Sequence, residues 1–77
     1  MASVNILLDT IEKVKFFVNT IATIDGDFDL SSNRYVVDAK SIMGIFSLDL
    51  SKTLRLDVHD EATLQEVKKA LKDYIVN

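Results

Sequence analysis

The stretch Lys40-Ser41-Ile42-Met43-Gly44-Ile45-Phe46-Ser47-Leu48 decides how the rest of the chain is interpreted. It places several large apolar side chains and two serines between two strand-like runs, where a connecting segment is normally polar. Apolar residues in such a segment either fill a core or form a surface that contacts a partner. We expect a short helix here, from Ile42 to about Leu48, with Ser41 as its N-cap.

The size and composition of the chain indicate one folded domain, residues 1–77. A hydrophobic content of 48% is that of a globular protein and is well above that of a disordered chain. The sequence has no cysteine, which fits a reducing compartment. Its apolar runs are too short to span a bilayer, and its first residues lack the charged start of a secretory signal, so we expect a cytoplasmic protein.

The charge balance bears on the class of partner. Nine basic and twelve acidic residues give a formal net charge of −3. A mildly acidic domain without a basic stripe gains little from releasing counterions along a phosphate backbone. We therefore expect no nucleic-acid partner and no insertion into a membrane.

The amino-terminal part of the chain changes from a strand period to a helix period. Val4, Ile6 and Leu8 lie two residues apart, which predicts a strand over about residues 2–8. Apolar residues at three- and four-residue steps then predict an amphipathic helix over about residues 10–23. Asp9 is its expected N-cap, with Glu12 three residues later in the position of a capping box.

The remaining elements follow the same two periods. Phe28 and Leu30 alternate with polar residues in a second strand, and Ser31-Ser32-Asn33 predicts a hairpin into a third strand over about residues 34–38. A fourth strand covers residues 54–58. A last helix, capped by Asp60 or Thr63, is expected from the stripe Leu64, Val67, Leu71, Tyr74 and Ile75.

This order of elements predicts the fold class. Each strand offers one apolar face and each long helix one apolar stripe. We therefore expect an α+β domain with a four-stranded antiparallel sheet and all helices, two long and one short, on one of its faces. The predicted order is strand, helix, strand, strand, short helix, strand, helix.

Few residues are candidates for catalysis or metal binding. His59 lies beside Asp60, but no serine or cysteine nucleophile is placed to meet it, so we interpret it as a solvated residue at a strand end. Asp25, Asp27 and Asp29 alternate, which would place them on one solvent face of a strand, and they lack the glycine and glutamate of a calcium loop. We expect no catalytic residue, no metal site and no cofactor, and we do not expect an enzyme.

Ser41 has two interpretations on physical grounds. The first is an ordinary N-cap, which stabilises its helix by about 1 kcal/mol. The second is a site where an added phosphate would be tolerated and would change the charge beside Ile42, Met43 and Phe46. The residues alone favour the first.

The run from Asp38 to Leu48 resembles the signature around the regulatory serine of HPr, the histidine-containing phosphocarrier family of the bacterial sugar phosphotransferase system. The order of the elements, the chain length and the Ser32-Asn33 hairpin are also similar. The resemblance implies an HPr-like open-faced β-sandwich. It implies that Ser41 is a regulatory phosphorylation site, and that the partner-docking residues are Ile42, Met43 and Phe46.

The sequence departs from this family at the phosphocarrier motif. HPr carries its phosphoryl group on a histidine in a Gly-Leu-His-Ala/Thr-Arg-Pro motif at the start of the first helix, and here only Asp9, Thr10, Ile11 and Glu12 precede or open that helix. Asp49 also stands where the family commonly has Gly, and Arg34 where a hairpin Gly is usual. Asp49 would therefore place a negative charge close to the docking residues.

The resemblance and these departures lead to one hypothesis and one alternative. The hypothesis is an HPr-like regulatory or binding protein that cannot transfer phosphate through histidine and is switched at Ser41. Its implied partners are proteins, namely an HPr-type kinase and transcriptional or metabolic regulators. The alternative is a structural or dimerisation domain that uses the Ile42, Met43 and Phe46 face, with Ser41 only a helix cap.

Overall fold

A computed structural model describes residues 2–33 and 35–76 of the chain. Its strands are β1 (Ala2–Ile6), β2 (Phe28–Ser32), β3 (Tyr35–Asp38), β4 (Leu54–Val58) and β5 (Ile75–Val76). Its helices are α1 (Ile11–Ala22), α2 (Ile42–Phe46), the 3₁₀ turn η1 (Glu61–Thr63) and α3 (Leu64–Ala70). The predicted α+β class is confirmed.

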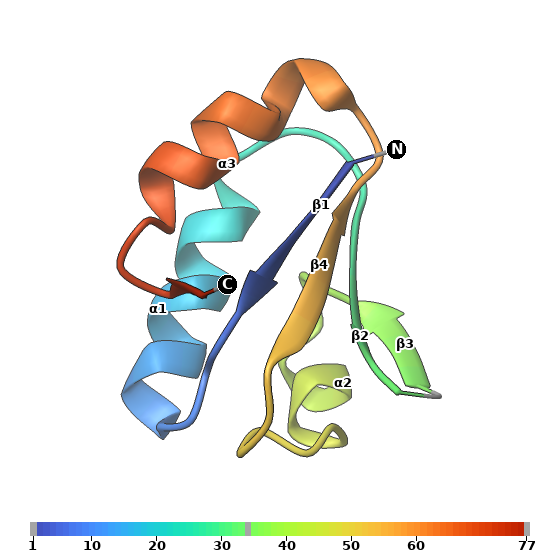
Figure 1. The fold of residues 1–77 in the computed structure, drawn as a ribbon, viewed down its shortest axis with the longest axis vertical. Helices are drawn as coiled ribbons and strands as arrows, with labels where there is room; N and C mark the ends of the chain where they lie inside the picture. The colour runs from blue at the N-terminus through green and yellow to red at the C-terminus, as the bar shows by residue number, and fades with distance from the viewer. Residues whose placement is uncertain (1, 34, 77) are drawn as a thin grey trace.

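The strands form one antiparallel sheet in the order β3-β2-β4-β1-β5 (Figure 1). Alternation places Leu54, Leu56 and Val58 of β4 on the covered face, where all three are fully buried. The apolar stripe of α1, with Val14, Phe17 and Ile21, packs into the same core. The other face carries mostly polar side chains, with the exposed Val36 among them, and is open to solvent.

The predicted four-stranded sheet and the continuous last helix are wrong at the carboxyl end. Helix α3 ends at Ala70, because Leu71 leaves helical geometry with φ −110° and ψ 16°. The chain then turns, with the Tyr74 amide donating to the Leu71 carbonyl at 2.9 Å. Ile75 and Val76 pair with Ile6 and Asn5 as a fifth strand.

The reason for this difference is the free edge of β1. Without β5, the backbone groups on that edge would lack sheet partners, and two β-branched residues suit a strand. The Leu7 amide also donates to the Tyr74 carbonyl at 3.0 Å, so the turn itself is tied to the end of β1. The spacing of Tyr74 and Ile75 fits a helical stripe, but these long-range bonds decide their conformation.

One predicted helix cap is wrong, and one of the two alternative caps of the last helix is supported. Thr10, not Asp9, caps α1: its hydroxyl accepts from the Lys13 amide at 3.1 Å. Thr63 makes no side-chain cap bond to α3, whereas the Asp60 carboxylate accepts from the Ala62 amide at 3.0 Å and caps η1. The predicted hairpin is confirmed, with Asn33 in the left-handed region at φ 44°. The predicted start of the third strand at Arg34 lies outside the described residues.

Candidate functional site

Helix α2 begins as predicted, with Ser41 as its N-cap. The backbone of Ser41 is extended, at φ −101° and ψ 106°, and its hydroxyl accepts a hydrogen bond from the Gly44 amide at 3.2 Å. This is the geometry in which a serine satisfies one of the amides that have no partner in the first turn of a helix. Ser41 is half-buried.

Helix α2 is held against the sheet through one face. Ile45 is fully buried and Leu48, just after the helix, is 6% exposed. Gly44 allows the close approach to β3, since a Cβ at this position would lie 3.1 Å from the Cβ of Val37. The inward face of α2 is therefore fixed by Gly44 and Ile45, and its remaining apolar residues must point elsewhere.

Those remaining residues are the three predicted docking residues. Met43 is 79% exposed, Phe46 44% and Ile42 38%. Large apolar side chains exposed on one short helix, next to the buried Ile45, form an apolar surface patch of the kind that marks a binding site. We call Ile42, Met43 and Phe46 the α2 face.

The cation next to Ser41 is directed away from the α2 face. The Lys40 ammonium donates to the Ile24 carbonyl at 3.1 Å and lies 5.5 Å from the centroid of the Phe28 ring. Lys40 therefore fastens the β3–α2 connection to the segment before β2.

The start of α1 carries an ion pair in place of a phosphocarrier motif. The Lys13 ammonium donates to the Asp9 carboxylate at 2.8 Å, and this hydrogen bond lowers the pKa of Asp9 below its usual value of 3.8. Thr10 satisfies the Lys13 amide. A phosphoryl group at this position would meet the negative charges of Asp9 and Glu12.

His59 lies on the open face of the sheet. Its Nε2 is 2.7 Å from an oxygen of Asp29, so the predicted solvated strand-end residue has a hydrogen-bond partner that the sequence did not reveal. That partner is Asp29 of β2 and not the neighbouring Asp60. Figure 1 shows that β4, which leads into His59, ends at the opposite end of the sheet from the start of α1. His59 is therefore remote from the place where a phosphocarrier histidine would stand.

The acidic triplet was predicted to lie along one strand, and this prediction is wrong. Only Asp29 is within β2, while Asp25 and Asp27 belong to the connection from α1. Among residues 2–33 and 35–76, no group of three or more histidine, cysteine or acidic side chains is arranged to hold a metal ion. Within the same residues, no helix is long and apolar enough to cross a membrane.

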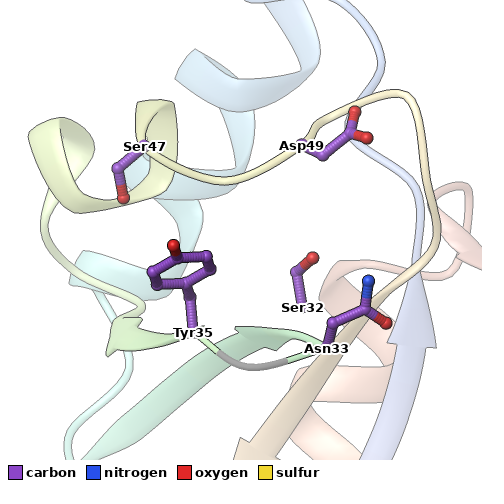
Figure 2. Close-up of a pocket in the computed structure, with 5 residues that line it drawn as sticks. All are labelled: Ser32, Asn33, Tyr35, Ser47 and Asp49. Carbon is purple, nitrogen blue, oxygen red and sulfur yellow. The ribbon is translucent and has the colours of Figure 1, made fainter.

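A polar pocket of about 450 Å³ adjoins the α2 face. Figure 2 shows that Ser32, Asn33 and Tyr35 line it from the β2–β3 hairpin and that Ser47 and Asp49 line it from the loop after α2, with the Asp49 carboxylate turned away from the hairpin. Ser51 donates to one oxygen of Asp49 through its amide, at 3.1 Å, and through its hydroxyl, at 2.6 Å. The hydrogen bonds from Ser51 lower the pKa of Asp49 below its usual value, so this carboxylate is ionised at neutral pH.

Of the residues that line this pocket, only Asp49 was expected from the sequence to influence binding. The others come from two segments that are separate along the chain and meet only when α2 packs against β3. The hairpin signal at Ser32-Asn33 and the loop after Phe46 were both visible. Their proximity depends on the tertiary fold.

Comparisons with known proteins bear on the fold. No protein-family model matches the sequence, and a search of curated proteins gives no match. Among solved structures, the chain is similar to HPr-C-His from Thermoanaerobacter tengcongensis, with a TM-score of 0.78 and 29% sequence identity. The match covers 95% of this chain and 89% of that one. The chain therefore has an HPr-like fold.

Proposed function

We propose that this chain is an HPr-like docking and regulatory protein of the cytoplasm that does not transfer phosphate through histidine. In this proposal the α2 face binds protein partners related to the bacterial sugar phosphotransferase system, and phosphorylation of Ser41 regulates that binding. The protein has no catalytic activity of its own. The observation that supports this most directly is the combination of an exposed α2 face beside Ser41 with a first helix that starts without histidine.

Ser41 is suited to regulate the α2 face because it immediately precedes Ile42 and Met43. A phosphoryl group adds a charge of roughly −1.5 to −2 near neutral pH. It also adds three oxygens that are strong hydrogen-bond acceptors. In the unmodified chain Ser41 contributes no charge, and the Lys40 ammonium is occupied by the Ile24 carbonyl. Phosphorylation would therefore change an apolar surface into one with a strong negative charge at its edge.

The direct test is phosphorylation by an HPr-type kinase. The purified chain and its Ser41→Ala variant are incubated with the kinase and ATP, and phosphopeptides are located by mass spectrometry. We expect modification of the parent chain at Ser41 and none in the variant. An unmodified parent chain, under conditions that phosphorylate an HPr control, would remove the switch from the proposal.

The absence of histidine phosphotransfer has its own assay. The chain is incubated with enzyme I and phosphoenolpyruvate carrying a labelled phosphate, beside an HPr control and a His59→Ala variant. We expect no acid-labile label on the chain. A label that His59→Ala removes would show that His59 acts as a carrier despite its place on the open face.

The exposure of Met43 also favours a second function, self-association through the α2 face. In that case Ser41 is only a cap. Light scattering over a range of protein concentrations separates the two: a dimer that Met43→Asp abolishes supports self-association. A monomer at every concentration leaves the face free for another protein.

A further inference from the structure

We propose that two copies of this chain associate through the free edge of β3, with the two strands antiparallel and Val36 at the dimer axis. The two sheets then form one continuous sheet. The residues involved are not those of the α2 face, so the inference goes beyond the proposed function and does not depend on it. The partner is a second copy of the chain because this edge is complementary to itself.

Strand β3 lies at one end of the sheet order β3-β2-β4-β1-β5, at the margin of the ribbon in Figure 1. Tyr35 is 67% exposed and Val36 62%, and they are the large exposed apolar residues among the described strands. Natural sheets commonly protect such an edge with lysine, proline or a bulge. Residues Tyr35–Asp38 include no lysine or proline and pair with β2 in an unbroken register. The edge is therefore open to another strand.

The hydrogen bonds to β2 show which backbone groups of β3 are free. Directly after β3, the Ala39 amide donates to the Phe28 carbonyl at 2.9 Å. Residues that exchange hydrogen bonds with a neighbouring strand alternate along an antiparallel ladder, so Val37 and Tyr35 also bond to β2. Val36, between them, turns its amide and its carbonyl toward the free edge. No described residue bonds to either group.

Two β3 strands fit each other with Val36 opposite Val36 of the second copy. Each Val36 amide then donates to the other Val36 carbonyl, and Tyr35 lies opposite Val37 of the second copy. Aromatic and β-branched residues that face each other in this way stabilise a sheet. A register centred on Val37 would place Val36 opposite the charged Asp38, and one centred on Asp38 would place two carboxylates opposite each other, which is destabilising.

Charge favours the same register. It places the exposed Asp38 opposite position 34 of the second copy, which is an arginine in the sequence. The Asp38 carboxylate accepts from the Lys40 amide at 2.9 Å and forms no ion pair with a described residue. Directly opposite charges favour strand pairing, and this pair occurs on both sides of the axis. Because β3 has only four residues, the interface is smaller than that of a stable dimer, so we expect association at high protein concentration.

Disulfide trapping tests the register, because the chain has no cysteine of its own. Opposite residues of an antiparallel pair have Cα atoms about 4.5–5.5 Å apart, within reach of a disulfide. In a glutathione buffer, Val36→Cys should form a covalent dimer several-fold faster than Ile11→Cys, a control on α1 that is 59% exposed. Each rate is divided by the reactivity of that thiol toward a small disulfide. Tyr35→Cys should cross-link with Val37→Cys faster than with itself.

Two variants without cysteine test the edge itself. Val36→Pro removes an amide that faces the free edge and leaves the ladder with β2 complete, as an edge strand tolerates. Val36→Lys places like charges opposite each other at the axis. Circular dichroism should show that both variants are folded. Light scattering should show that both remain monomeric at concentrations where the parent and Met43→Asp form dimers.

The inference is overturned if Val36→Cys and Ile11→Cys cross-link at equal corrected rates, or if the parent is a monomer at every concentration. It is also overturned if the dimer persists in Val36→Lys. A dimer that Met43→Asp abolishes and Val36→Lys retains would place self-association on the α2 face instead. The proposed function is tested separately, by phosphorylation of Ser41, so either idea can fail without the other.

Discussion

Replacement of Ser41 tests the structural role on which the proposed switch depends. In Ser41→Ala the Gly44 amide loses its acceptor at 3.2 Å, and the first turn of α2 has one more amide without a partner. Removal of an N-cap costs about 0.5–2 kcal/mol. Because this bond is at the long end of the usual range and only part-buried, we expect the lower half, about 0.5–1 kcal/mol.

Ser41→Asp separates the cap from the charge. Asp is as good an N-cap as Ser, and its negative charge is favourable at the amino end of a helix. We therefore expect the free energy of unfolding of Ser41→Asp to lie within about 0.5 kcal/mol of the parent value, clearly above that of Ser41→Ala. Thr10→Ala is the matched control, because Thr10 caps α1 through the same type of bond, at 3.1 Å.

Urea unfolding followed by circular dichroism measures these differences. A domain of this size has a total stability of roughly 4–12 kcal/mol, so all three variants should remain folded. In thermal unfolding, the loss in Ser41→Ala corresponds to a lowering of Tm by about 2–8 °C. If Ser41→Asp is destabilised as much as Ser41→Ala, the Ser41 hydroxyl does not act as a cap and the reasoning is refuted.

Two further predictions concern the start of α1 and the turn before β5. The hydrogen bond from Lys13 lowers the pKa of Asp9 below 3.8, so the ionised carboxylate stabilises the folded chain fully above that pH and loses this effect as the pH falls through the lowered value. Urea unfolding should show the parent more stable than Asp9→Asn at neutral pH, and this difference should shrink as the pH falls below 3.8. A difference that stays constant in acid contradicts the assignment. The rings of Phe16 and Tyr74 lie 5.2 Å apart and tilted by 58°, so a double-mutant cycle to Ala should give a coupling free energy of about 0.5–1 kcal/mol. A coupling below about 0.3 kcal/mol would show that this pair does not hold the turn.

The elements predicted correctly are those whose period repeats within one segment. Leu54, Leu56 and Val58 alternate with polar residues, and the structure buries all three. Ser41 was identified as a cap because a serine directly before an apolar run is a local signal. In both places the local preference and the tertiary packing agree, which is why the sequence was sufficient.

The errors arise where tertiary contacts decide between two acceptable local structures. Asp9 and Thr10 are both good caps and are adjacent, and the ion pair of Asp9 with Lys13 leaves Thr10 at the cap position. Ile75 fits either a helical stripe or an edge strand, and the free edge of β1 selects the strand. The local sequence contains no information about that edge.

Contacts between side chains on the open face of the sheet could not be predicted from the sequence either. His59 and Asp29 are 30 residues apart and meet because β2 and β4 are neighbours in a register that pairs Asp29 with Asp57. Alternation alone shows that each of these residues faces solvent. Only the strand order shows which of them are in contact.

Ser41, once phosphorylated, and Asp49 would act largely independently of each other at the two ends of the α2 face. Helix α2 has five residues, so at about 1.5 Å per residue its ends are about 7–8 Å apart, and Ser41 and Asp49 lie beyond those ends at a separation of roughly 10 Å. This is about one Debye length at 0.1 M salt, where exposed charges are substantially screened from one another. A phosphoryl group on Ser41 would then alter the Met43 end of the face with little effect on the charge of Asp49 at the other end.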